Sequence, residues 1–175
     1  MKAIVVYRSK SGFTRKYAEW IAADLGADCF DCRKIAPRLF GDYEVIVFGG
    51  SLHKGGINGI SVIRRNLALL AGKRLIVFVT GGSVPRAGIE EEILDANFCE
   101  DERKGVRLYY FRGGMDVGKL GILDKLMMIG RRRKLLRENP SELTETDRAF
   151  LAAFASPADG TDKAVTGPLV AYARS

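Results

Sequence analysis

The chain alternates short, continuously apolar runs with segments whose apolar residues recur every three or four positions. The runs are rich in Val, Ile and Phe, and they lie at Ala3–Tyr7, Asp28–Asp31, Val45–Phe48, Leu75–Val79 and Val106–Phe111. Continuous runs are typical of strands that helices cover on both faces. The alternation therefore predicts parallel strands joined by crossover helices, with the second strand the weakest.

Helical spacing fills the segments between these strands. The predicted apolar faces comprise Tyr17, Ile21 and Leu25; then Ile60, Ile63, Leu67 and Leu70; then Ile89, Ile93 and Ala96. Further helices are predicted at Lys119–Leu136 and Thr144–Phe154, and a last one that begins near Thr161 or at Thr166, with Pro168 in its first turn. We expect one domain over residues 1–175. It is an α/β three-layer sandwich whose five-stranded parallel sheet has the doubly wound order 2-1-3-4-5.

Composition narrows the class of protein. Hydrophobic residues make up 47% and charged residues 28% of the chain, as in globular proteins. No apolar run is long enough for a membrane-spanning helix, and Met1–Tyr7 leads into a strand, so we expect a cytoplasmic protein. The net charge of +7 predicts an anionic partner: a phosphate cofactor, an acidic substrate, a membrane surface or nucleic acid. The densest basic cluster is Arg131–Arg137.

Two of the three cysteines, Cys29 and Cys32, form a C-x-x-C pair. A redox pair of this type needs its first thiol at a helix N-terminus. Here the pair falls at a strand end, where residues three apart point to opposite faces of the sheet. We interpret both as ordinary structural thiols.

The turn between the first strand and the first helix carries the strongest chemical signal. It consists of Ser9, Lys10, Ser11, Gly12, Phe13 and Thr14. Backbone amides at a helix start, together with hydroxyls, bind a phosphate monoester, and Gly12 lets the backbone approach closely. A capped helix start without a ligand is the alternative, but the position after the first strand favours a phosphate site.

Glycine pairs follow three further strands, at Gly49–Gly50, Gly81–Gly82 and Gly113–Gly114. The carboxyl ends of parallel strands meet at one edge of a sheet, so these pairs suggest a shared ligand. Tight turns that simply require glycine are the alternative for any single pair.

The S-K-S-G-F-T turn resembles the phosphate loop of flavodoxins, T/S-x-T-G-x-T. The resemblance implies a flavodoxin-like fold that binds flavin mononucleotide (FMN), with residues 9–14 holding its phosphate. It also implies that the turns after later strands border the isoalloxazine ring, where glycines leave the backbone flexible enough to follow changes in ring protonation. The candidate ring-site residues are Gly50, Ser51, Leu52, His53, Lys54, Gly55, Thr80, Gly81, Gly82, Ser83, Gly113 and Gly114.

Other nucleotide sites are not supported. No G-x-G-x-x-G follows a strand, and no G-x-x-x-x-G-K-[ST] is present, which argues against Rossmann and P-loop sites. A response-regulator receiver needs acidic residues at strand ends, whereas the first strand here ends in Tyr7 and Arg8. We expect no metal site.

The chain also differs from small electron-carrier flavodoxins. Those carriers are acidic and enclose the ring between Trp and Tyr, whereas this chain is basic and its only tryptophan, Trp20, lies in the first helix. A less covered ring leaves room for a planar substrate, and positive charge stabilises anionic reduced flavin. His53, the only histidine, is a candidate proton donor to the flavin, and a solvated surface residue is the alternative.

A second resemblance is to the flavodoxin-like, menaquinone-dependent protoporphyrinogen dehydrogenases. The residues that carry it are Gly49–His53, Phe111–Met115, the Met-containing segment Leu123–Ile129 and Thr161–Asp162. The resemblance implies oxidation of a porphyrinogen with transfer of electrons to a quinone. The Arg131–Arg137 cluster would then meet anionic lipid headgroups, at the inner face of the cell membrane, or substrate propionates. A solvated helix face is the alternative.

Three functions therefore stay open on the sequence. The first is an FMN-dependent oxidoreductase acting on a quinone or a porphyrinogen-like substrate. The second is an electron carrier that serves a redox protein partner, and the third is a flavin-free module that binds anions. Nucleic acid is not expected as a partner, and a homo-oligomer is left open.

Overall fold

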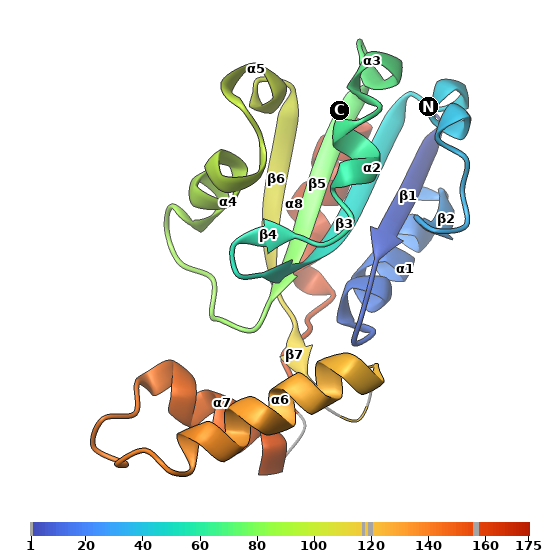
Figure 1. Cartoon of the computed structure of the whole chain (residues 1–175). Helices are drawn as coiled ribbons and strands as arrows, with labels where there is room; N and C mark the ends of the chain where they lie inside the picture. Colours follow the sequence, from blue (N-terminus) through green and yellow to red (C-terminus); the bar gives the residue numbers. More distant parts are fainter. Residues whose placement is uncertain (1, 117, 119–120, 156–157) are drawn as a thin grey trace.

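The computed structural model describes residues 2–116, 118, 121–155 and 158–175. Its main elements are β1 (Ala3–Arg8), α1 (Phe13–Leu25), β2 (Asp28–Asp31), a 3₁₀ helix (Pro37–Asp42), β3 (Val45–His53), β4 (Gly56–Ile57), α2 (Ser61–Arg64), α3 (Leu67–Leu70), β5 (Arg74–Gly81), α4 (Ile89–Asn97), α5 (Glu100–Arg103), β6 (Val106–Arg112), β7 (Gly114–Met115), α6 (Ile122–Leu135), α7 (Glu145–Ala155), β8 (Ala158–Asp159) and α8 (Gly167–Arg174) (Figure 1).

The main sheet has the order β2-β1-β3-β5-β6, and each of these pairs is parallel. This confirms the doubly wound order predicted from the apolar runs. The short strand β4 folds back antiparallel onto the end of β3, pairing Leu52 with Ile57 and His53 with Gly56. The runs at Val45–Phe48 and Leu75–Val79 form the first part of longer strands, which continue through Gly49–Gly50 in β3 and to Gly81 in β5.

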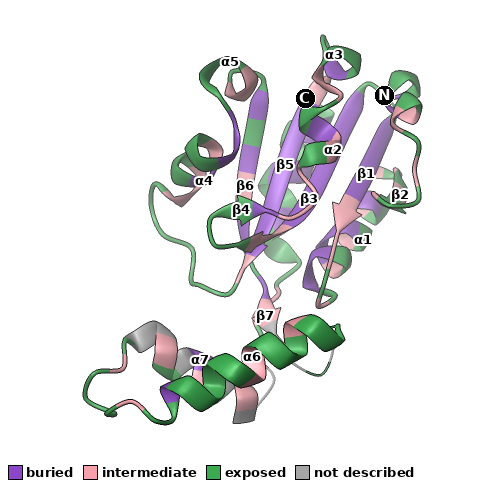
Figure 2. Ribbon diagram, in the orientation of Figure 1, coloured by how far each residue is buried: buried purple, intermediate pink, exposed green. Residues whose placement is uncertain are grey.

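Helices cover both faces of the sheet, which makes the protein a three-layer sandwich. On one face Val5, Val47 and Ile76 pack against Tyr17 of α1 and Leu169 of α8. On the other face the core includes residues of the 3₁₀ helix, α2 and α4. Figure 2 shows the central strands buried along most of their length. Burial on both sides is the reason that these strands appear in the sequence as continuous apolar runs.

One helix prediction needs correction, and one choice between two helix starts is settled. The apolar stripe from Ile60 to Leu70 forms two short helices, α2 and α3, rather than one. Asn66 separates them, because its backbone leaves helical geometry at φ −122° and its side-chain amide donates to the Val62 carbonyl. Of the two starts considered for the last helix, Thr166 is correct, since α8 begins at Gly167 with Pro168 in its first turn. The predicted start of α6 at Lys119 lies outside the described residues.

Between β6 and α8 the chain leaves the sandwich and forms an arm, which we define as the described residues between 114 and 159. In the arm, α6 and α7 lie beyond the carboxyl end of the sheet and contact each other (Figure 1). The strands β7 and β8 pair antiparallel at its base, with Gly114 opposite Asp159. Thr144 begins α7 as the predicted N-cap, because its hydroxyl accepts a hydrogen bond from the Asp147 amide.

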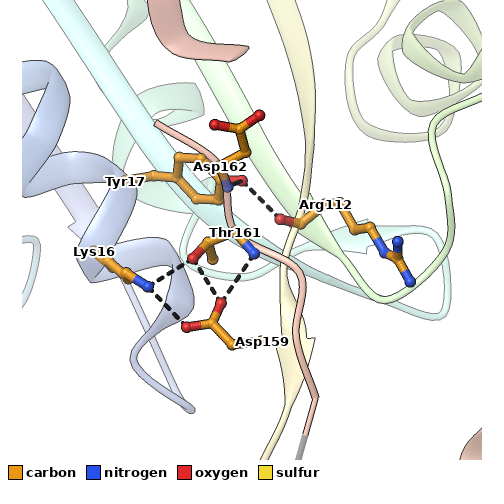
Figure 3. Close-up of polar contacts among 6 residues, drawn as sticks. All are labelled: Lys16, Tyr17, Arg112, Asp159, Thr161 and Asp162. Carbon is orange, nitrogen blue, oxygen red and sulfur yellow. Dashed lines mark hydrogen bonds and ion pairs between the residues drawn. The ribbon is translucent and has the colours of Figure 1, made fainter. Parts of the chain in front are cut away.

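Side chains of α1 hold the chain where it leaves for the arm and where it returns (Figure 3). The Tyr17 hydroxyl donates to the Arg112 carbonyl at 2.8 Å and accepts from the Asp162 amide at 3.0 Å. The Lys16 ammonium donates to the Asp159 carboxylate and to the Thr161 hydroxyl, both at 2.7 Å. The Asp159 carboxylate also accepts from the Thr161 hydroxyl at 2.6 Å. The hydrogen bonds from Lys16 first and from Thr161 next lower the pKa of the Asp159 carboxyl to about 2. Among the described residues, no helix has the length and apolar content needed to cross a bilayer.

Candidate functional site

The turn between β1 and α1 is closed by its own side chains. The Ser9 hydroxyl accepts a hydrogen bond from the Gly12 amide at 3.1 Å, and the Gly12 carbonyl accepts the first helical bond from Lys16. Gly12 has φ +93°, a left-handed conformation that disfavours any side chain. The sequence S-K-S-G-F-T therefore folds into a tight turn that directs the start of α1 toward the site.

The charges around this turn suit an anion. The first turn of α1 contains no acidic residue, so the positive end of its dipole is not offset. Lys10 lies in the turn, where its ammonium pairs with Asp124, and Arg15 lies in the first turn of α1, where its guanidinium pairs with Glu19 at 2.7 Å. Together with the hydroxyls of Ser9 and Ser11, this set of donors fits the phosphate of FMN.

Thr14, the last residue of the motif, faces the sheet rather than the turn. It is buried, and its hydroxyl shares a hydrogen bond of 2.7 Å with the hydroxyl of Thr80, which is buried on β5. In this structure the Thr14–Thr80 pair fixes the start of α1 against the sheet. The other hydroxyls and amides of the turn are then the donors available to a phosphate.

A cavity of about 210 Å³ lies at the carboxyl ends of β3, β5 and β6, beside the β1–α1 turn. The predicted site residues that line this cavity come from four separate segments of the chain. They are Lys10, Ser11 and Phe13; Ser51, Leu52 and His53; Thr80, Gly81 and Gly82; and Gly113 and Gly114. Two of the three glycine pairs, Gly81–Gly82 and Gly113–Gly114, thus line one cavity, whereas Gly49–Gly50 does not.

The remaining predicted residues lie outside the cavity lining: Ser9, Gly12, Thr14, Gly50, Lys54, Gly55 and Ser83. Steric packing explains several of the glycines. A Cβ on Gly49 would overlap the Phe78 ring, and one on Gly81 would overlap Tyr110. A Cβ on Gly50 would lie 2.5 Å from the Ile57 side chain. These three glycines are needed for close packing inside the sheet and hairpin rather than for a tight turn, since none of them has a positive φ.

The arm supplies four lining residues that the sequence predictions did not include: Asp116, Asp124, Met127 and Met128. Asp124 of α6 accepts a hydrogen bond from the Lys10 ammonium at 3.0 Å, which joins the arm to the phosphate turn. The methionines place apolar, adaptable side chains over the cavity. The Met-containing segment was the available signal, but nothing in the sequence shows that it folds back over the strand ends.

The cavity walls differ from an aromatic enclosure. Among the described residues that line it, Phe13 is the one aromatic residue, and there is neither tryptophan nor tyrosine. Trp20 instead packs edge-on against Tyr17 and lies under the Lys16 ammonium. The ring of a bound flavin would therefore meet aliphatic and sulfur-containing side chains, together with His53.

The cysteines take no part in this site. Cys29 packs against one face of the sheet and Cys32 against the other, as their spacing on a strand predicts. Burial raises the pKa of the Cys29 thiol to about 11 and also raises the pKa of Cys32, so both are protonated at neutral pH. Among the described residues, no group of histidine, cysteine and carboxylate side chains is arranged to hold a metal ion.

A doubly wound sheet with a phosphate turn after β1 and a cavity at the strand ends defines a flavodoxin-like flavoprotein. The flavodoxin domain family matches residues 4–158, and the chain belongs to this family. FMN is accordingly its cofactor, which argues against the flavin-free alternative. The residues of the turn and cavity described above provide the donors and walls that FMN needs.

Comparisons with individual proteins find partial similarities. An uncharacterized protein of Methanocaldococcus jannaschii is 36% identical over 56 residues, which span 31% of this chain and 37% of that protein. A flavodoxin from the domain Archaea is 22% identical, with a TM-score of 0.41 over 63% of this chain and 85% of that one. Flavodoxin 2 from Bacillus cereus is 21% identical, with a TM-score of 0.44 over 63% and 84%.

Proposed function

We propose that the protein is an FMN-dependent oxidoreductase with two-electron chemistry of the porphyrinogen and quinone type. The observation that carries the proposal is the apolar cover that α6 places over the strand-end cavity through Met127 and Met128. Without tryptophan or tyrosine among the described lining residues, this cover leaves a planar, largely apolar substrate a surface on which to stack. Bound FMN supplies hydride acceptance and electron transfer, while the protein supplies binding, orientation and charge.

The overall charge of the chain, +7, favours two-electron reduction. Within the cavity lining Lys10 is paired with Asp124 and lies beside Asp116, so the positive potential comes from the chain as a whole. Positive charge near the flavin stabilises its anionic reduced form, and it also attracts substrates that carry carboxylates. In acidic carrier proteins the negative charge destabilises the anionic reduced flavin instead.

We assign proton delivery in this reaction to His53. Its side chain lies at the cavity wall, on the strand end that faces the cover from α6. Histidine is the side chain that most often serves as a general acid or base in catalysis. We expect His53→Gln to lower turnover about 100-fold while FMN affinity stays within twofold, since general acid–base catalysis contributes about 10²–10⁴-fold.

Anaerobic mixing of the FMN-loaded, reduced protein with menaquinone tests the proposal. We expect rapid return of the oxidised flavin absorbance, and we expect porphyrin fluorescence when the oxidised protein is mixed with protoporphyrinogen. A matched variant, Met128→Lys, places a charge in the apolar cover and should slow both reactions while FMN stays bound. Absence of both reactions would contradict the oxidoreductase proposal. Accumulation of half-reduced flavin during stepwise reduction would favour the electron carrier.

We further propose that the partner surface of the protein is an anionic membrane. The outward side of α6 first presents three exposed apolar residues, Ile122, Leu123 and Leu126. About two turns further along α6 presents Arg133 and Lys134, and Arg137 follows just beyond its end, all exposed. Figure 2 shows α6 exposed along most of its length. In the proposed contact, the apolar residues meet the lipid acyl chains and the cations that follow them meet the anionic headgroups.

The structure refines the role of the basic cluster Arg131–Arg137. Arg131 pairs with Asp147 at 3.0 Å and lies over the Phe150 ring, so it holds α6 against α7. Arg132 lies over the ring of Phe154, which also belongs to α7. The outward cations are therefore Arg133, Lys134 and Arg137. A second copy of the chain is a poor fit to this face, because symmetrical contact would bring like charges together.

Vesicle sedimentation tests the membrane proposal. We expect binding to vesicles that contain phosphatidylglycerol, weaker binding at high salt, and little binding to pure phosphatidylcholine. Leu123→Ser with Leu126→Ser should reduce binding at least tenfold, whereas Val84→Ser, an exposed apolar residue outside the arm, should not. Equal binding by all three proteins, or a stable dimer without lipid affinity, would contradict it.

A further inference from the structure

Asn97, the last residue of α4, is one of the few polar side chains buried in the described part of the molecule, with 8% of its surface exposed. Its side chain makes three hydrogen bonds. The oxygen accepts from the Ile57 amide at 2.9 Å, while the nitrogen donates to the Gly55 carbonyl at 2.7 Å and to the Ile93 carbonyl at 2.8 Å. An amide group is needed here, because one end must accept and the other must donate.

Two of these bonds hold the β3–β4 hairpin. The two turn residues, Lys54 and Gly55, both have positive φ, at 50° and 82°, as in the tight hairpin turns that suit twisted strands. Asn97 binds the turn at the Gly55 carbonyl and the return strand at the Ile57 amide. The Ile57 side chain is buried in the core. The hairpin is therefore held both by the Asn97 hydrogen bonds from α4 and by the packing of Ile57.

The held hairpin is also a wall of the strand-end cavity. Ser51, Leu52 and His53 line the cavity, and Leu52 and His53 are the residues of β3 that pair with β4. The sequence suggested a flexible glycine-rich segment that could follow the flavin as its protonation changes. The structure instead shows a paired hairpin with a buried side chain behind it.

We propose that Asn97 is a positioning residue of the flavin site, which keeps this wall in one conformation whatever the oxidation state of the cofactor. The inference rests on the proposed use of the cavity for FMN. A wall fixed in advance binds its ligand more tightly, because less conformational freedom is lost on binding. A wall that does not rearrange also gives no special stabilisation to the half-reduced flavin, which suits two-electron chemistry.

Asn97→Ala tests the proposal, and Asn66→Ala is a matched control. Asn66 also donates its side-chain amide to the carbonyl four residues earlier in a helix, but it is remote from the cavity lining. We expect Asn97→Ala to raise the Kd for FMN about 5- to 30-fold, or about 1–2 kcal/mol. It should also raise the half-reduced fraction during reductive titration. Asn66→Ala should leave both within twofold of the wild type.

Hydrogen exchange in the flavin-free protein gives a reading that does not depend on the cofactor. The Ile57 amide should exchange at least tenfold faster in Asn97→Ala and should be unchanged in Asn66→Ala. Asn97→Asp is the second variant if the alanine variant does not fold, because it keeps the acceptor for Ile57 and loses both donated bonds.

The outcomes are distinct. Faster exchange at Ile57 with unchanged FMN affinity and an unchanged half-reduced fraction would overturn the positioning role while the proposed function stands. Unchanged exchange at Ile57 would overturn it as well. A wild-type protein that binds FMN but reacts with neither quinone nor porphyrinogen would overturn the proposed reaction, and the Asn97 effects would still be measurable.

Discussion

The sandwich and the arm use apolar residues in opposite ways. In the sandwich, side chains such as Phe48, Ile76 and Phe78 are fully buried between the sheet and its helices. In the arm, Ile122 is 83% exposed and Leu123 is 74% exposed. The apolar residues of the sandwich stabilise the fold, whereas the outward ones on α6 contribute little to it. Their exposure is the basis of the proposed contact between the arm and a membrane.

The two regions are nevertheless joined at the places that matter for the site. The Lys10–Asp124 pair links the phosphate turn to α6. The Tyr17 hydroxyl links α1 to Arg112, where the chain leaves for the arm, and to Asp162, where it returns. The sandwich thus provides the phosphate turn and strand ends, and the arm completes the cavity. Substitutions in the two regions should separate these contributions.

The largest effect is expected for Phe78→Ala in the sandwich. The Phe78 ring is fully buried, lies against Gly49 and packs near the Phe111 ring with centroids 5.7 Å apart. Its removal leaves a cavity that the sheet cannot close, at a cost of about 3–5 kcal/mol. Denaturant unfolding measures this loss. Val84→Ala, on an exposed loop, is the control, and a loss under about 1 kcal/mol for Phe78→Ala would contradict the burial of Phe78 between the sheet and its helices.

A smaller effect is expected for Tyr17→Phe, which acts at the junction of the regions. The variant keeps the ring stacked on Phe111 but removes the hydroxyl between the Arg112 carbonyl and the Asp162 amide. Partly buried groups that lose a hydrogen-bond partner cost about 1–3 kcal/mol. Unfolding should show this loss, together with faster hydrogen exchange at Asp162. Tyr172→Phe, at an exposed position of α8, is the control, and equal stability of the two variants would argue against the junction.

The same contrast shows how far the sequence predicts the molecule. The strands were predicted correctly because a continuous apolar run has one good solution, burial on both faces. The strand ends were harder: β3 continues through glycines and polar residues to His53, where hydrophobicity carries no signal. The helix near Asn66 was predicted wrongly because an apolar stripe does not reveal that a side chain interrupts the backbone.

The site was predictable where its residues are contiguous. The S-K-S-G-F-T turn and the glycine pairs stand beside predicted strands, so topology brings them together. Asp124, Met127 and Met128 reach the cavity through an arm whose position depends on contacts such as Lys10–Asp124, across 114 positions of sequence. No sequence motif marks Asn97. Its proposed role depends on its hydrogen bonds to the Gly55 carbonyl and the Ile57 amide, which the fold brings next to the end of α4.

A weaker and pH-dependent effect is expected for Asp159 at the base of the arm. Its folded pKa of about 2 lies below the ordinary value of about 3.9, so its ion pair with Lys16 stabilises the fold above about pH 4. That contribution is lost as the pH falls from about 4 to 2. Because the carboxylate is half exposed, solvent limits it to about 1 kcal/mol or less.

Unfolding of Asp159→Asn across this range provides the measurement. The variant should be slightly less stable than the wild type at pH 7, and the difference should shrink toward pH 2. Asp101→Asn, which breaks a highly exposed pair with Lys104, is the control. A difference that grows on acidification would show that the carboxylate is not stabilised in the folded state.

The smallest effect on stability is expected where the exposed apolar surface is greatest. Ile122→Ser changes the first residue of α6, whose side chain is mostly in solvent, so the free energy of unfolding should stay within about 0.5 kcal/mol of the wild type. Set against Phe78→Ala, this result would show that an equally apolar residue does no structural work in the arm. A loss above about 1.5 kcal/mol would instead mean that the outward face of α6 is packed within the chain, and the membrane proposal would then lose its contact surface.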